Sequence, residues 1–221
     1  MPRTVEKYSR DPDATRKRIL AAAKHEFAKH GLGGARVDRI ALRAKSNKRM
    51  IYHYFGNKDA VFRRTLEDTY EAFRQAETAL LLEADEPILA IKRLVAFTWD
   101  YYLANPEFIT LVNSENLHKA KHLKTSRLMD DINQPFVARM KHLLEHGVRR
   151  GEFREGLDAV QILISLSGLG FHYLTNRHTG AIVYKRDLMD TKALQARLDF
   201  NTVSILRMIC TTDTIKKLEN S

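Results

Sequence analysis

The side chains best suited to recognition chemistry lie between residues 47 and 53. This run carries two cations, one flexible apolar chain and two rings with hydrogen-bonding atoms, namely Lys48, Arg49, Met50, Tyr52 and His53. Arg and Lys pair with phosphates and with the acceptor atoms of guanine. Asn47 can cap a helix here, because its side-chain oxygen can accept from an unpaired backbone N–H. The run therefore predicts a short helix whose N-terminal residues contact double-stranded DNA.

Another short helix is expected directly before this one, over residues 37–44. Its apolar residues recur at helical spacing and are Val37, Ile40, Ala41 and Ala44. Only residues 45–47 separate the two segments, which is the spacing of a helix-turn-helix. We expect Arg36 and Val37, where the first helix of the pair begins, to contact DNA together with Asn47 and the residues after it.

A longer helix is expected to support this pair. Asp11-Pro12 can begin it, because Pro suits the first helical turn, and Gly31 can end it. Its buried stripe is predicted to be Ile19, Leu20, Ala23 and Phe27. After Phe55, Asn57 can cap a linking helix over residues 57–82, which we expect to be the only covalent link between two domains.

The run I-Y-H-Y-F-G-N-K-D-A follows this helix-turn-helix, and the supporting helix ends in F-A-K-H-G. With these motifs, residues 15–61 resemble the N-terminal domain of the TetR family of bacterial transcriptional regulators. The resemblance implies three DNA-binding helices, a fourth linking helix, and about five more that carry a ligand cavity and dimerise. It also implies that Lys58 contacts a DNA phosphate. Three positions depart from the family: Val37 replaces the usual Thr, Lys45 the usual Gly, and Arg49 a small residue.

The distribution of charge also divides the chain shortly after the predicted helix-turn-helix. Residues 1–64 hold 17 Lys and Arg against 6 Asp and Glu, so their net charge of +11 accounts for the whole chain's +10. The remaining residues hold 20 basic and 21 acidic side chains, a net charge of −1. This distribution predicts a phosphate-binding domain, residues 1–56, joined to a neutral domain, residues 57–221.

Composition favours an all-α fold of about nine helices in these two domains. The 221 residues include only 10 Gly and 5 Pro, and no alternating apolar run is flanked by hairpin turns. The single cysteine, Cys210, excludes an internal disulfide and suits a reducing compartment. We find no apolar run long enough for a membrane span and no signal peptide, so we expect a cytoplasmic protein with no membrane contact.

Two C-terminal segments predict a homodimer. The segment at residues 157–176 is apolar almost all round, and a helix of that kind must be buried on every side. The last helix, about residues 192–211, can supply its partner. Two helices from each subunit would then form a four-helix interface.

Polar and aromatic residues inside the predicted apolar helices are candidates for binding a small-molecule effector. They are Tyr70, Phe73, Trp99, Tyr102, Asn113, Asn116, Ser167, Phe171 and His172. Ligand pockets are mostly apolar with a few placed polar groups, although each aromatic could equally be simple core. The C-terminal motifs N-P-E-F and G-F-H-Y-L-T-N are more loosely similar to the TetR branch that includes the pyrimidine-utilisation regulator. That similarity favours Phe73, Ser167 and Phe171, although Ser167 replaces a large aromatic of that branch, so the same effector is not implied.

Catalytic and metal chemistry are not indicated. The sequence has no Gly-rich phosphate loop, no nucleophile elbow and no recognisable pair of catalytic carboxylates, so we expect neither an enzyme nor a cofactor. His118 and His122 are four residues apart and could share a metal. Because Lys119 and Lys121 lie between them and no third ligand is evident, we expect a solvated pair and no metal site.

These observations favour a homodimeric, ligand-responsive DNA-binding regulator. We expect it to repress by binding a palindromic operator and to be released by a small molecule. The two DNA-reading helices, one from each subunit, would lie about 34 Å apart. Two alternatives remain at this point. One is a sequence-tolerant architectural DNA-binding protein, and the less favoured one is an enzyme on a helical scaffold.

Overall fold

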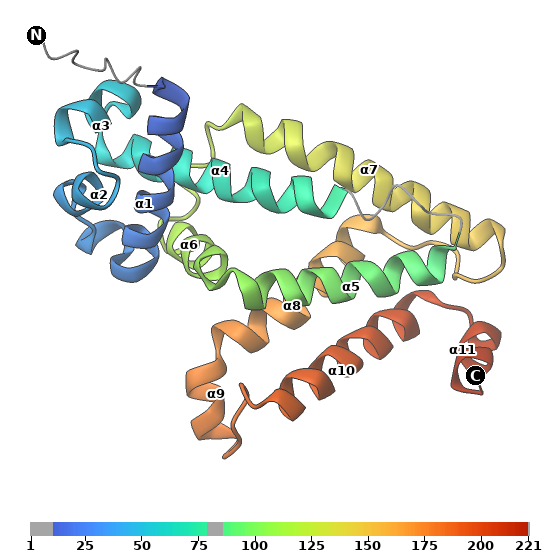
Figure 1. The fold of residues 1–221 in the computed structure, drawn as a ribbon. Helices are drawn as coiled ribbons and strands as arrows, with labels where there is room; N and C mark the ends of the chain where they lie inside the picture. The colour runs from blue at the N-terminus through green and yellow to red at the C-terminus, as the bar shows by residue number, and fades with distance from the viewer. Residues whose placement is uncertain (1–10, 79–85, 221) are drawn as a thin grey trace, which may run out of the picture. The chain divides into compact units, whose positions relative to one another are not determined.

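The computed structural model describes residues 11–78 and 86–220 and has eleven helices in that part of the chain (Figure 1). They are α1 Pro12–Gly34, α2 Val37–Arg43, α3 Lys48–Phe55, α4 Lys58–Thr78, α5 Pro87–Ala104, α6 Pro106–Leu117, α7 Arg127–Arg149, α8 Ala159–Thr175, α9 Arg177–Val183, α10 Thr191–Ile209 and α11 Thr212–Glu219. The described residues contain no β-strand, only an isolated bridge between Phe153 and Cys210. The all-α prediction is confirmed.

The expected number of about nine helices was too low. The short helix α9 follows α8 almost directly, and α11 follows the end of α10. The sequence analysis missed α11 because it extended α10 to Thr211. That residue instead caps α11, since its hydroxyl oxygen accepts a hydrogen bond from the backbone N–H of Thr214 at 3.4 Å.

Helix α1 begins and breaks where the sequence predicts. The Asp11 carboxylate accepts hydrogen bonds from the backbone N–H groups of Asp13 at 2.9 Å and Ala14 at 3.3 Å, and Pro12 is the first helical residue. Gly31 has a positive φ of 64°, which interrupts the helical geometry before a last turn ending at Gly34. The chain can therefore change direction into α2.

Helices α1 to α3 and the beginning of α4 enclose one hydrophobic core. The predicted stripes are confirmed, since Ile19, Leu20, Ala23 and Phe27 of α1 and Val37, Ile40, Ala41 and Ala44 around α2 are all buried. Ile51 anchors α3 in this core with no exposed surface. Phe62 of α4 meets Phe27 edge to face, with ring centroids 5.0 Å apart. This core fixes which side of α3 faces outward.

The chain forms two compact units that are not contiguous in sequence. One unit contains the residues up to Thr69 and Leu111–Ser126, and the other contains Tyr70–Thr110 and the residues from Arg127 onward. Both α4 and α6 therefore contribute residues to both units. The predicted domains, residues 1–56 and 57–221, have different boundaries, so they and the covalent link expected between them stay predictions. Residues 79–82 of the predicted linking helix lie outside the described residues.

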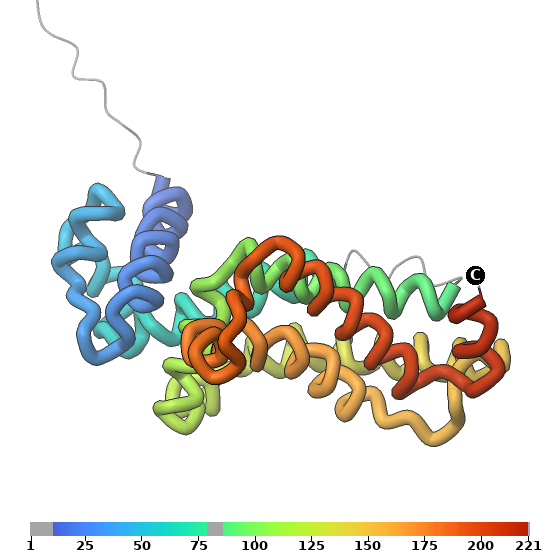
Figure 2. The backbone as a smooth tube through the Cα atoms, turned by 90° about the horizontal axis from the view of Figure 1, so that it is seen from below, coloured from blue at the N-terminus to red at the C-terminus, as the bar shows by residue number. Residues whose placement is uncertain are grey.

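In the second unit, α5 packs against α7, α8 and α10, and α8 also contacts α7 and α10 (Figure 2). The core between them is mostly aliphatic, with Ile91, Leu94, Met140 and Ile205 fully buried. At Gly170 on α8, a Cβ would make ordinary van der Waals contact with the Tyr102 ring at 3.4 Å and with Trp99 at 3.5 Å, so α8 lies directly against α5 here. No helix among the described residues is both long enough and apolar enough to span a bilayer.

Candidate DNA interface and effector site

The helix-turn-helix presents α3 as predicted. The Asn47 side-chain oxygen accepts a hydrogen bond from the Met50 backbone N–H at 2.8 Å, so Asn47 caps the helix. Lys45 in the preceding turn has a φ of 49°, the left-handed conformation in which the resembled family usually has Gly. A non-Gly residue pays on the order of 1 kcal/mol for this conformation. The turn keeps its geometry without the glycine.

Most of the predicted DNA-contacting side chains lie on the surface. Lys48, Arg49, Tyr52 and His53 are exposed, as are Arg36 and Asn47, and Met50 is half-buried. Val37 differs, because its side chain is only 6% exposed within the core. That side chain cannot reach a base, and only the backbone of Val37 remains available to DNA.

Two lysines predicted to contact phosphates have different surroundings. The Lys48 ammonium forms an exposed ion pair with Asp38 at 3.4 Å, a kind of contact worth little in water and easily exchanged for a phosphate. The Lys58 ammonium instead donates to the backbone carbonyls of Ala35 at 3.1 Å and Gly33 at 3.5 Å. Lys58 thus fastens the start of α4 to the junction between α1 and α2.

Sequence reasoning missed a buried carboxylate that braces the same junction. Glu26 is only 6% exposed, and its Oε1 accepts hydrogen bonds from the Arg36 backbone N–H at 3.0 Å and from the Arg39 guanidinium at 3.2 Å. An ionised carboxylate can accept several hydrogen bonds at once, which makes its burial tolerable. The apolar spacing of α1 could not predict this role of Glu26. The residue stands next to Phe27 and leaves the pattern of the apolar stripe unchanged.

The second unit brings together most of the predicted effector residues. Phe73 is 3% exposed, and its ring contacts those of Phe97, Tyr101, Tyr102 and Phe108 at centroid distances of 5.9, 4.8, 6.0 and 5.1 Å. Two further ring contacts extend this aromatic cluster: Tyr70 meets Phe108, and Phe171 meets Tyr102. Ser167 lies beside the Tyr102 hydroxyl, and Trp99 forms a separate pair with Tyr173. Burial raises the pKa of Tyr102 to about 12, so its hydroxyl stays neutral and can act as a donor.

Three other predicted effector residues have surroundings of their own. Asn113 and Asn116 belong to the first unit, where Asn116 is exposed and its side-chain amide donates to the Val112 carbonyl at 3.1 Å. His172 is exposed on α8, and its ring lies 3.3 Å from the Asn176 amide nitrogen. The assignment of these three residues to an effector stays a prediction.

A polar group borders the aromatic cluster. Glu77, 3% exposed, pairs with the Arg74 guanidinium, which also donates to Asn133 at 2.8 Å and lies over the Phe73 ring at 5.1 Å. Arg139 donates to the Thr78 hydroxyl at 2.8 Å. Burial raises the pKa of Glu77 to about 7, against the opposing effect of the two guanidinium groups. Charged side chains therefore lie directly beside the aromatic rings.

The expectation of a solvated histidine pair was wrong for His122. His122 is only 6% exposed, and its Nδ1 lies 2.6 Å from Oε2 of the buried Glu115. His118 is exposed, and its Nδ1 lies 2.7 Å from the Ser114 carbonyl. Charged neighbours in the sequence suggested solvent for both, but the chain folds His122 back against α6 and α4.

Comparison with known families agrees with this architecture. The family described as "Bacterial regulatory proteins, tetR family" matches residues 19–65, and "Tetracyclin repressor-like, C-terminal domain" matches residues 87–205. The HTH-type transcriptional repressor NicS of Pseudomonas putida is 38% identical over 195 residues, 88% of this chain and 92% of NicS. The HTH-type transcriptional repressor SCO4008 of Streptomyces coelicolor is 35% identical over 72% of this chain and 77% of its own length.

A solved structure shows the same fold. The crystal structure of the putative transcriptional regulator SCO4942 from Streptomyces coelicolor superposes with a TM-score of 0.64 and 27% identity, covering 88% of this chain and 98% of that one. Both ends of the chain are thus matched, the helix-turn-helix and the helical C-terminal part. The chain belongs to the TetR family of bacterial DNA-binding transcriptional regulators, whose members are not enzymes.

Proposed function

We propose that this chain represses transcription as a homodimer on a palindromic operator and leaves the operator when a small molecule binds its second unit. The observation that carries the proposal is the position of α3. Its cationic N-terminal residues are exposed, while Ile51 on its opposite side is fully buried in the core. A helix held in this way can enter a major groove without disturbing the fold that supports it.

Within the DNA interface, phosphate contacts and base contacts have separate consequences. We assign Lys48 and Lys58 to phosphates, which fix the position of the protein but carry no sequence information. Arg49 is the side chain that we assign to a guanine, because a guanidinium can donate to O6 and N7 together. Tyr52 and His53 lie next on the exposed side of α3 and would extend the contact.

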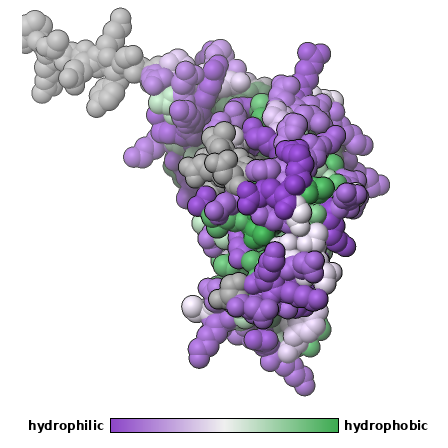
Figure 3. All heavy atoms as spheres, turned by 90° about the vertical axis from the view of Figure 1, so that its right-hand side faces the viewer, coloured by the Kyte–Doolittle hydropathy of each residue, from purple (hydrophilic) through white to green (hydrophobic). Residues whose placement is uncertain are grey.

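Exposed apolar residues on α8 and α10 support the dimer. Val160 and Ile164, one helical turn apart on α8, are 46% and 59% exposed, and Phe200 and Val203 on α10 are 57% and 48% exposed. These helices contact one another within the chain, so their apolar residues could be covered together by a second copy. By contrast, the face of the molecule in Figure 3 carries mainly hydrophilic side chains, with small hydrophobic patches between them.

The aromatic cluster is the proposed effector site. Its rings already contact one another around Phe73, so an effector has to separate them and replace their mutual contacts. Phe108 links this rearrangement to the first unit. Its ring contacts Phe73, and it lies near the start of α6, a helix that also contributes residues to the first unit. A ligand that binds better to the separated arrangement would shift the protein toward it. A coupling of about 1–3 kcal/mol would change operator affinity roughly 5- to 150-fold.

Binding of the purified protein to the DNA upstream of its own gene tests the proposal. The measurement is made at physiological salt with random DNA as competitor, because non-specific affinity depends strongly on salt. We expect a complex of two subunits per site that survives the competitor. Equal affinity for random DNA would contradict the proposal and favour the architectural alternative. We expect this function to operate in the cytoplasm, where the DNA is.

A further inference from the structure

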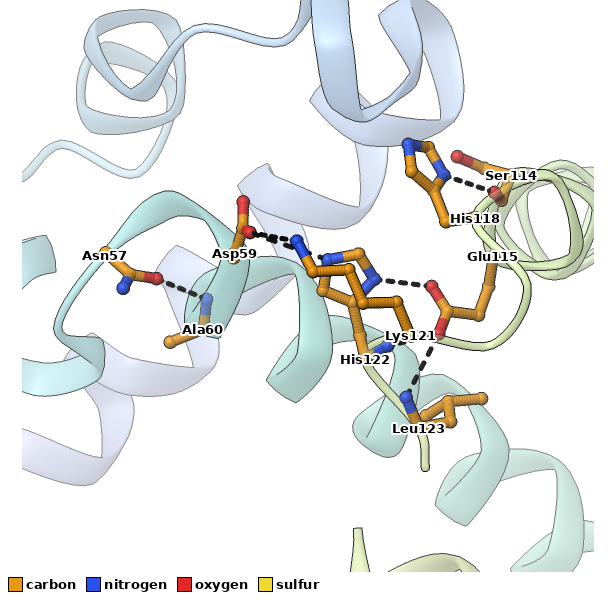
Figure 4. A network of polar contacts seen from close by, with 9 residues as sticks. All are labelled: Asn57, Asp59, Ala60, Ser114, Glu115, His118, Lys121, His122 and Leu123. Carbon is orange, nitrogen blue, oxygen red and sulfur yellow. Dashed lines mark hydrogen bonds and ion pairs between the residues drawn. The ribbon is translucent and has the colours of Figure 1, made fainter. Parts of the chain in front are cut away.

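One buried polar network in the first unit contains no residue that we have assigned to DNA or to the effector. Its centre is Glu115 on α6, whose carboxylate is 4% exposed and accepts three hydrogen bonds (Figure 4). Oε1 accepts from the backbone N–H groups of His122 at 2.7 Å and Leu123 at 3.0 Å, and Oε2 lies 2.6 Å from the His122 ring nitrogen Nδ1. One carboxylate thereby fixes both the backbone and the side chain of the segment that follows α6.

The segment between α6 and α7 holds an unfavourable backbone shape to make these contacts. Lys119 and Ala120 have φ values of 56° and 55°, the left-handed conformation that residues with a Cβ rarely adopt. Such residues persist only where surrounding contacts hold them. Leu123 supplies one such contact by packing against the core of α1 to α3, and the Glu115 carboxylate supplies the others.

The imidazole of His122 reaches α4 on its other side. Nε2 lies 3.8 Å from the carboxylate of Asp59, and the ring meets Phe62 edge to face at a centroid distance of 5.1 Å. Asp59 lies in the first turn of α4, directly after Lys58. The network therefore ends one residue from the lysine that holds the junction of α1 and α2.

The positions of the protons follow from the acceptors. An ionised carboxylate can only accept, so the short contact with Glu115 requires a proton on Nδ1 of His122. Among the described residues, the buried Nε2 has no hydrogen-bond partner, and the nearest carboxylate on its side of the ring is that of Asp59. The imidazole therefore lies between a carboxylate of α6 and a carboxylate of α4.

We infer that Glu115, His122 and Asp59 position the first turn of α4 for DNA binding, with His122 as the positioning residue between the two carboxylates. The inference rests on the proposed DNA-binding function. The charged groups around the imidazole are Glu115 from α6, Asp59 from α4 and Lys121 from the same segment, whose ammonium lies 3.3 Å from Asp59. His118, the other titratable ring, lies 5.8 Å away between centroids.

The test compares His122→Gln with His118→Gln, each as the full-length dimer on the operator. His118 is a matched control because it lies in the same segment, is exposed, and is not paired with a carboxylate. We expect His122→Gln to weaken operator binding roughly 2- to 30-fold, the range found for positions that act through other residues. The slope of log affinity against log salt should not change, since no phosphate contact is lost. His118→Gln should leave both quantities as they are.

The pH profile separates positioning from simple stabilisation. The pH profile of operator affinity should differ between the wild type and both His122→Gln and Asp59→Asn, because these variants remove the imidazole or its second carboxylate. If His122→Gln melts at a lower temperature but binds the operator with wild-type affinity and pH profile below its melting point, the inference is overturned. If the wild-type protein shows no preference for the operator, the proposed function fails instead.

Discussion

The reading helix α3 and the aromatic cluster around Phe73 are built in opposite ways. The N-terminal residues of α3 are exposed cations and rings that have little to do with holding the fold together. Phe73, Trp99 and Tyr102 are 3–4% exposed and form part of the packing of their unit. DNA-contacting side chains on α3 can therefore be changed at little cost in stability, whereas any change in the cluster alters both the proposed effector site and the stability of the unit that contains it.

The same contrast governs how each region responds to its ligand. DNA can bind α3 without moving a core residue, because the helix is already capped and anchored. An effector could enter the cluster only by separating rings that now contact one another. Under the proposed function, rearrangement would accompany effector binding and not DNA binding, which is the asymmetry that an effector-controlled repressor requires.

The largest expected difference is in stability, between a variant that loses a ring of the aromatic cluster and a variant that loses a ring of α3. Phe73→Ala is expected to lower the free energy of unfolding by about 3–5 kcal/mol, because it removes a buried ring and leaves a cavity. Tyr52→Ala, on the exposed side of α3, should change it by no more than about 0.5 kcal/mol. Chemical denaturation of both variants measures the difference. Similar losses in the two would mean that the regions are not built as differently as the structure shows.

The buried Glu77 should make the stability of the second unit depend on pH. Its pKa is raised from 4.5 to about 7 in the folded chain, so between these pH values the unfolded chain binds fewer protons than the folded one. The free energy of unfolding must then fall as pH rises through this window, by up to about 3 kcal/mol, and level off above pH 7.

Glu77→Gln isolates this contribution, because the amide does not titrate. At pH 5 the folded wild type carries Glu77 largely as the neutral acid, so the variant should be close to it in stability there. The denaturation midpoint of the variant should fall less than that of the wild type between pH 5 and pH 7. A variant with the same pH dependence as the wild type would show that Glu77 keeps an ordinary pKa.

On the DNA side, Arg49→Ala should cost affinity without costing stability. Losing a guanidinium that contacts guanine is expected to weaken binding to the preferred operator by about 1–3 kcal/mol and to relax the preference at one base pair. Binding to a set of operators mutated one base pair at a time measures both effects. An equal loss on random DNA would assign Arg49 to a phosphate instead.

The two regions also differ in how far the sequence could predict them. The cap at Asn47 and the apolar stripe of α2 are local patterns, and both are confirmed. The links between Asp59 and His122 and between Arg74 and Asn133 join residues about 60 positions apart, and no local period encodes such pairs. Local charge even misled the interpretation of His122, because Lys119 and Lys121 are exposed while the ring is buried. Long-range polar pairing depends on which surfaces meet, and that is decided by the whole core.

The smallest effects should separate the two phosphate-contacting lysines. If each contacts one phosphate, Lys48→Ala and Lys58→Ala should each make the negative slope of log affinity against log salt shallower by about 0.9. Only Lys58→Ala should also lower the free energy of unfolding, by about 1–2 kcal/mol, because its ammonium donates to the carbonyls of Ala35 and Gly33 while Lys48 has an exposed partner. Salt titrations and denaturation of the two variants measure these quantities independently. An unchanged slope for Lys58→Ala with a full loss of stability would assign Lys58 to the fold alone, and the DNA interface would then end at α3.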